Sequence, residues 1–193
     1  MGERLLKKYR VLFSKGLETL SEWESTQVLA VALVSSSSNI IKRLPVLTDD
    51  TNFGELCDDV ELIEAVKGKQ MEALSSNIQR LREQICIFNR LSSCLERLAL
   101  EGRQFFQDLK PEQTTLGGIR RGGNPSICEC QEGLEDFSRI HRDECNLKSA
   151  LVKGLTLHTS AAELDQILAL MHSQPNIDPG YVKHLRLMFQ PLE

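Results

Sequence analysis

Apolar residues recur at intervals of three and four along most of this chain, which is the spacing of one face of an α-helix. The clearest stripe lies between about residues 58 and 109, with charged residues between its apolar positions. It persists for more than three heptads, so it predicts a long bundle or coiled-coil helix. Its members are Leu74, Ile78, Leu81, Ile85, Phe88, Leu95 and Ala99.

A second stripe predicts helix over about residues 3–44, before Pro45. Gly16, Gln27 and Ser37 interrupt its apolar seam, and the run Ser35–Asn39 has low helix propensity. The segment is therefore either one long helix or two helices that meet near Gly16. The apolar positions are Leu6, Tyr9, Phe13, Leu20, Trp23, Ala30, Val34, Ile41 and Leu44.

Three further helix starts are marked by capping residues. A Ser followed three residues later by Glu is a capping box, and Asp before Pro is a common cap and first turn. These signals predict a third long helix over about residues 126–157 and two short helices at the C-terminal end. The pairs are Ser126 with Glu129, Ser160 with Glu163, and Asp178 with Pro179.

Two segments lack helical periodicity. Residues 45–57 form the first predicted loop, and from Pro45 to Glu64 there are seven acids and no base. These acids either suit the positive end of the next helix dipole or form an acidic docking patch. Residues 111–125 form a Gly-rich linker. The predicted fold is all-α: an elongated bundle of three long helices (about 3–44, 58–109 and 126–157) with two short C-terminal helices, in a single domain over 1–193.

Composition narrows the class of protein. The chain is 41% hydrophobic, which is enough for a core, whereas its 5% aromatic content is low for a β-sandwich. Its net charge of -4 does not favour direct DNA binding. The longest apolar run, Val28–Val34, is far short of the roughly 20 residues of a membrane span. The six cysteines suggest reduced thiols in an intracellular protein.

Candidate chemistry is sparse. No phosphate-binding loop, nucleophile elbow or HExxH motif is present, so we expect no catalytic residue, cofactor or metal. A zinc site at Cys128, Cys130, His141 and Cys145 is the weaker alternative, since Cys128 and Cys130 are not spaced as a zinc knuckle. Arg120 and Arg121 in the linker resemble one RGG element.

Residues spread over most of the chain resemble one known family. They include Trp23, Ser25, Ser35, Ser36, Ser38, Asn39, Leu44, Lys69, Gln70, Glu96, Arg97, Pro125, Ser126, Leu134, Asp136, Arg139 and Arg142. On these positions the chain resembles the AIRIM family, the ribosome maturation factors that partner AFG2-type AAA ATPases. The linker residues Gly117–Gly123 depart from that family's pattern.

The last third is also similar to a second family, the kinase-interacting protein CINP. The shared positions are His141, Arg142, Glu144, Leu147, Lys148, Val152, Lys153, Leu155, Gln174 and Pro175. Together the resemblances imply a non-enzymatic adaptor of the cytoplasm and nucleus. Its partners would be AFG2-type AAA ATPases, a CINP-like helical subunit and, indirectly, pre-ribosomal particles. The implied role is release of a maturation factor from large-subunit precursors, with a further role in replication-linked protein turnover.

Partner contacts are predicted on the helix stripes and at two arginines. The residues are Trp23, Leu74, Ile78, Leu81, Ile85, Phe88, Leu134, Phe137, Arg139 and Arg142. Three alternative functions remain: a coiled-coil scaffold of cytoskeletal or kinetochore type, a CINP-like kinase- or replication-associated adaptor, and an RNA-binding module. The RNA-binding module would use the linker arginines and the basic face around Arg80, Arg82 and Arg90.

Overall fold

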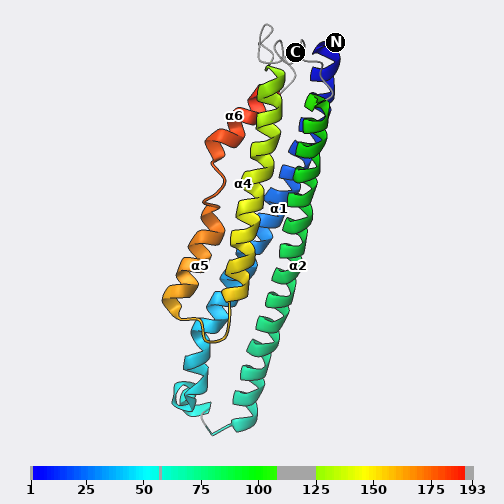
Figure 1. The fold of residues 1–193 in the computed structure, drawn as a ribbon. Coiled ribbons are helices and arrows are strands. Elements are labelled where there is room, and N and C mark those ends of the chain that lie inside the picture. The colour runs from blue at the N-terminus through cyan, green and yellow to red at the C-terminus, as the bar shows by residue number, and fades with distance from the viewer. Residues whose placement is uncertain (1, 57, 108–124, 190–193) are drawn as a thin grey trace. The chain divides into compact units, whose positions relative to one another are not determined.

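The computed structural model describes residues 2–56, 58–107 and 125–189, and within these ranges it contains helices and no strand. The prediction of an all-α fold with three long helices and two short C-terminal ones is confirmed (Figure 1). The elements are α1 Gly2–Thr48, the 3-10 helix η1 Asp50–Leu56, α2 Val60–Gln107, α4 Ile127–Gly154, α5 Ala161–Ser173 and α6 Pro179–Phe189. No described helix combines the length and apolarity that a membrane span requires.

Helix α1 is one continuous helix, so the alternative of two helices meeting near Gly16 is wrong. It also continues through the serine run and past Pro45, and η1 follows, so most of the predicted loop over 45–57 is helical. Two hydroxyl groups earlier on α1 donate back to carbonyls four residues before them, Thr19 to Lys15 at 2.8 Å and Ser25 to Ser21 at 3.0 Å, within helical geometry. Pro45 lies in the last turn of α1, so the hydrogen bond removed by its missing N–H is among the last of the helix, which ends three residues later at Thr48.

The three helix starts read from the sequence are confirmed. The Ser126 hydroxyl accepts from the Glu129 N–H at 3.2 Å, and the Glu129 carboxylate accepts from the Ser126 N–H at 2.8 Å. Ser160 and Glu163 form the same reciprocal capping box at α5. At α6, the Asp178 carboxylate accepts from the Gly180 N–H at 2.8 Å. Local side-chain chemistry therefore sets where these helices begin.

The contacts of the chain form two compact units. Unit 1 contains Met1–Ser25, Phe88–Asn146 and Pro175–Glu193, and unit 2 contains Thr26–Ile87 and Leu147–Gln174. Helices α1, α2 and α4 each contribute to both units. The single domain over 1–193 stays a prediction. Residues 108–124, which hold nearly all of the predicted Gly-rich linker, lie outside the described residues.

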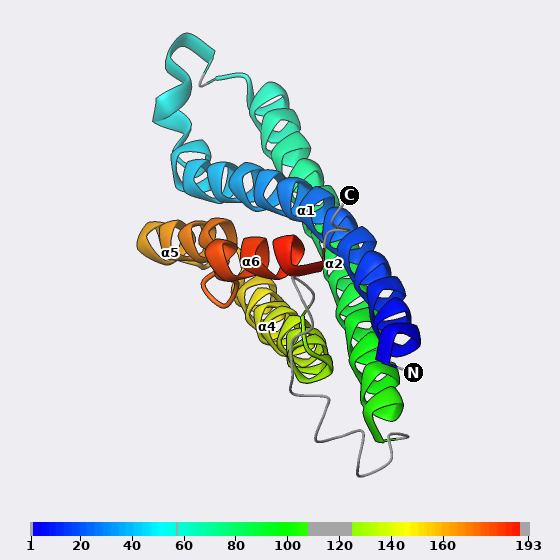
Figure 2. The same cartoon turned by 90° about the horizontal axis from the view of Figure 1, so that it is seen from above.

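In unit 1, the N-terminal part of α1 lies beside the C-terminal part of α2, so the two run antiparallel (Figure 1; Figure 2). Tyr9 is fully buried between them and α4, and its hydroxyl donates to the Gly102 carbonyl at 2.8 Å. The apolar core around it consists of Leu5, Leu12, Phe13, Leu20, Leu95, Leu98, Ala99, Ile127, Cys130, Leu134, Phe137, Ile140 and Leu185. Apolar stripes from four helical segments thus pack into one core.

In unit 2, a buried polar network joins α1, α4 and α5. Lys148 is fully buried, and its ammonium donates to Gln27 Oε1 at 2.7 Å. Gln27 Nε2 in turn donates to the Met171 carbonyl at 2.6 Å. These bonds offset part of the cost of removing a charged group from water. The polar interruption at Gln27 in the α1 seam is therefore matched by a buried partner.

Gly102 allows the close approach of α2 to its neighbours in unit 1. A Cβ at this position would lie 2.8 Å from both Gln131 Oε1 and Leu134 Cδ1 and 3.2 Å from Tyr9 Cε1. We expect Gly102→Ala to destabilise the protein by about 2 kcal/mol, because overpacking outweighs the gain in helix propensity. Urea denaturation followed by circular dichroism measures the change.

Gly68 on the same helix provides the matched control. It is exposed, and a Cβ there would meet nothing within 4 Å. Gly68→Ala should therefore stabilise the protein by up to about 1 kcal/mol. Equal effects of the two substitutions would contradict the close packing at Gly102.

Candidate partner-binding surface

Most of the residues predicted to contact a partner are buried within the chain. Ile78 and Ile85 are half-buried, and Arg139 and Arg142 are exposed. A partner would reach the buried members only if the helices separated. Their role in binding stays a prediction, while their role in packing is observed. The buried members are Trp23, Leu74, Leu81, Phe88, Leu134 and Phe137.

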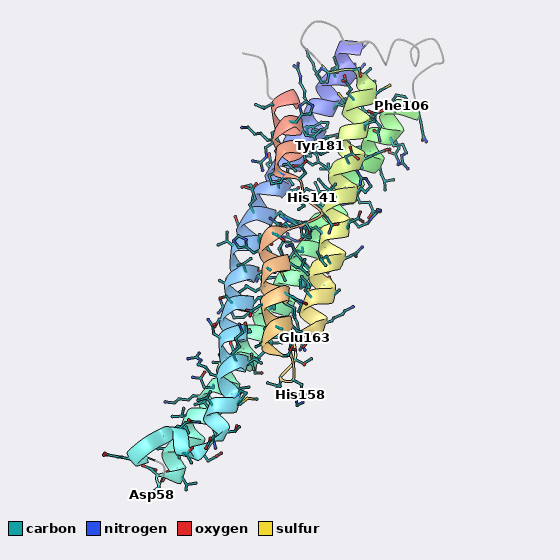
Figure 3. The ribbon with its side chains drawn as sticks, turned by 90° about the vertical axis from the view of Figure 1, so that its left-hand side faces the viewer. Asp58, Phe106, His141, His158, Glu163 and Tyr181 are labelled. Carbon is teal, nitrogen blue, oxygen red and sulfur yellow. The ribbon has the colours of Figure 1, made fainter. Side chains whose placement is uncertain are left out.

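Trp23 is the largest of these buried side chains. Its ring meets Phe88 edge-on at a centroid distance of 4.6 Å and His141 at 4.9 Å. All three side chains belong to unit 1. Burial lowers the pKa of His141 to about 4, against the opposing effects of its bond to the Phe137 carbonyl and of nearby Glu144. His141 is therefore a neutral core residue near pH 7, and Figure 3 shows it among the helices.

The zinc alternative finds no support in the described residues, which contain no group of three or more potential ligands placed to share a metal. Cys128 and His141 lie on one helix, α4, and are separated by about 20 Å along its axis. Burial raises the pKa of Cys130 to about 12, which keeps its thiol protonated rather than in the thiolate form that binds zinc. Cys145 donates instead to Asn89 Oδ1 at 3.4 Å.

The two exposed arginines of the prediction lie next to acids of α4. Arg139 pairs with Asp136 at 2.7 Å, and Arg142 lies 3.6 Å from Asp143. Partial burial alone would raise the pKa of Asp136, but hydrogen bonds from Tyr181 and Arg139 outweigh it and lower that pKa. Asp136 on α4 therefore accepts a hydrogen bond from Tyr181 on α6, which links the two helices. Arg139 already has this carboxylate as a partner.

Unit 2 offers an exposed apolar depression on α2. It has a volume of about 280 Å³ and is lined by Met71, Leu74, Ser75, Ile78, Gln79, Arg82 and Leu157. Met71 and Leu157 are 40% and 46% exposed, although both are large apolar side chains. Leu74 and Ile78 were predicted as partner contacts; Ile78 is half-buried and reaches this surface, whereas Leu74 lines the depression but is only 2% exposed. We call this surface the α2 depression.

A second depression lies across the end of α4 and the face of α5. It has a volume of about 360 Å³, and its apolar rim residue Leu170 is 37% exposed. We call it the α5 depression. Figure 3 shows His158 and Glu163 of its lining close together at the loop that precedes α5. The full lining is Leu151, Gly154, Thr156, His158, Thr159, Glu163, Gln166, Ile167 and Leu170.

The sequence did not single out Met71, Leu157 or Leu170 as binding residues. Leu157 lies in the short connection after α4, where helical periodicity gives no information. Met71 lies three residues before Leu74, so it continues the three-and-four spacing of the apolar seam of α2 toward the start of the helix. That spacing was the available signal for Met71, but it does not tell an exposed seam position from a buried one.

One comparison with known proteins identifies relatives. A family model described as "CA109-like: Ribosome biogenesis protein C1orf109-like" matches residues 3–187. No curated protein matches the chain. The family match covers both units and every described helix except the ends of α1 and α6.

Proposed function

Because the chain belongs to the C1orf109-like family of ribosome biogenesis proteins, we propose that it is a non-enzymatic adaptor subunit of an AFG2-type AAA ATPase complex. The adaptor joins the ATPases to cytoplasmic precursors of the large ribosomal subunit and assists release of a maturation factor. A CINP-like helical protein is the expected companion subunit. The same assembly would act in replication-linked protein turnover, with the adaptor present in cytoplasm and nucleus.

The proposed role in ribosome maturation rests on the family match. The proposed binding role is supported by the surface of the described residues. Large exposed apolar side chains on a folded protein often mark contacts with other proteins. In the α5 depression, Leu170 lies beside Glu163 and Gln166, so apolar and hydrogen-bonding groups are side by side. This mixture suits a protein partner. The proposal therefore assigns the ATPase contact to the α5 depression.

Affinity purification of the tagged full-length chain from dividing cells tests this proposal. We expect AAA ATPase subunits and large-subunit precursors among the retained proteins. Leu170→Asp should reduce their recovery by about tenfold or more, because a carboxylate in an apolar contact loses its hydration. Circular dichroism should show an intact fold, since Leu170 is partly exposed.

Leu100→Asp is the matched control, because Leu100 is an exposed leucine of α2 in unit 1. It should retain the ATPase subunits at the level of the unchanged chain. Recovery of only the chain itself or of cytoskeletal proteins would overturn the adaptor proposal and favour the coiled-coil scaffold. Equal losses with both variants would place the contact elsewhere.

A further inference from the structure

One face of α2 in unit 2 carries apolar residues that the chain's own helices leave exposed or only half-buried. Val60 is 67% exposed and Met71 is exposed as well, while Ile78 on the same face is half-buried. The face continues at steps of three and four, so its residues form one stripe along the helix. We call it the α2 stripe; it comprises Val60, Glu64, Lys67, Met71, Ser75, Ile78 and Arg82.

The charges of the α2 stripe lie toward opposite ends. Glu64 is two-thirds exposed and forms only a surface pair with Lys67 at 3.2 Å, which contributes little stability. Arg82, at the other end, has no ion pair or hydrogen bond with any residue in the described ranges. The stripe thus offers an accessible acid and an unpaired base, with Met71 and Ile78 between them.

The charges of the α2 stripe are complementary to those of a second, antiparallel copy of the same stripe. Glu64 and Arg82 lie nine residues on either side of Ala73. If a second α2 packs antiparallel about a two-fold axis at that level, Glu64 lies opposite Arg82 of the second copy, and the reverse pair forms as well. Met71 then lies opposite Ser75 of the second copy. The α2 depression, lined by Leu74, Ile78 and Leu157, can receive a methionine side chain there.

We propose that the α2 stripe is a homodimer interface, in which α2 of a second copy packs antiparallel and forms two Glu64–Arg82 ion pairs. The contact extends from Val60 to Arg82, about 33 Å along the helix. Two apolar depressions flanked by complementary charges give the interface both its attraction and its register. The inference goes beyond the proposed function and does not depend on the ATPase contact.

Sedimentation equilibrium of the full-length chain over a range of concentrations tests the dimer. The unchanged chain is expected to dimerise. Arg82→Glu, or Glu64→Arg alone, should weaken dimerisation by about tenfold or more, because each places like charges opposite each other twice. The double variant Glu64→Arg with Arg82→Glu restores both pairs in reverse and should bring the dissociation constant back to within about threefold.

Arg80→Glu and Glu72→Arg are matched controls, since both reverse exposed charges on α2 outside the stripe. They should leave dimerisation unchanged. A chain that is monomeric at all concentrations, a dimer insensitive to Arg82→Glu, or a double variant that fails to recover would each overturn the proposal. Recovery of ATPase subunits by the Arg82→Glu variant, measured separately, reports on the proposed function alone.

Discussion

Replacement of Trp23 by alanine is expected to lower the free energy of unfolding by about 4 kcal/mol, within the range for large aromatic residues removed from a core. Trp23 is only 2% exposed and packs edge-on against Phe88 and His141. Three helical segments of unit 1 surround it, so local collapse cannot easily fill the space left by the indole. Urea denaturation followed by circular dichroism at 222 nm measures the loss.

Val11→Ala is the control for this substitution, because Val11 lies on the exposed side of α1 within the same unit. It should change the stability by less than about 0.6 kcal/mol, since alanine is the better helix former and little burial is lost. If Trp23→Ala proved as mild as this control, the indole would not be a core residue. Its predicted role as a partner contact would then become the better explanation.

Helix positions could be predicted because local rules decide them. The capping pairs at Ser126 and Ser160 and the Asp178–Pro179 step each predicted a start that the structure confirms. The same local rules failed for α1, where Gly16 and Pro45 argued for a break. Tertiary packing overrides that preference: Gly16 is buried, with room for a Cβ 3.9 Å from Leu98 Cδ1.

Polar interruptions in an apolar seam were visible in the sequence, but their partners were not. Gln27 interrupts the α1 seam, and Lys148 is more than a hundred residues away. A sequence pattern gives the face on which each lies, whereas only the packing of α1 against α4 and α5 brings the two together within unit 2. Helical periodicity carries no information on such a pair, so the sequence alone does not distinguish a buried lysine from an exposed one.

The candidate binding surface is harder to predict than the core for a related reason. A stripe that packs internally and a stripe that receives a partner have the same composition, so Leu81 and Ile78 could not be told apart. In the structure Leu81 is fully buried, whereas Ile78 lines the α2 depression. The discriminating information is which faces the chain's own helices already cover. That depends on long-range packing rather than on local sequence.

Acid is expected to destabilise unit 1 through His141. The neutral ring, with its proton on Nδ1, donates to the Phe137 carbonyl at 2.8 Å and is almost fully buried. Its pKa of about 4 in the folded protein lies below the value of 6.5 for an exposed histidine. The unfolded chain therefore binds more protons below pH 6.5, and stability falls as the pH drops toward 4. Between pH 7.5 and 5 the expected loss is about 2 kcal/mol.

Urea denaturation at the two pH values, followed by the fluorescence of the single tryptophan, measures this loss directly beside the titrating ring. His141→Gln keeps an amide donor and removes the titration, so its stability should change about 2 kcal/mol less between the two pH values. His158→Gln alters an exposed histidine and should keep the full pH dependence. If His141→Gln kept it too, groups other than His141 would cause the loss. The hydrogen-bonded carboxylates Glu135 and Asp136 act at lower pH, because their lowered pKa values make acid destabilising only as the pH falls through the ordinary values of 4.5 and 3.8 and below.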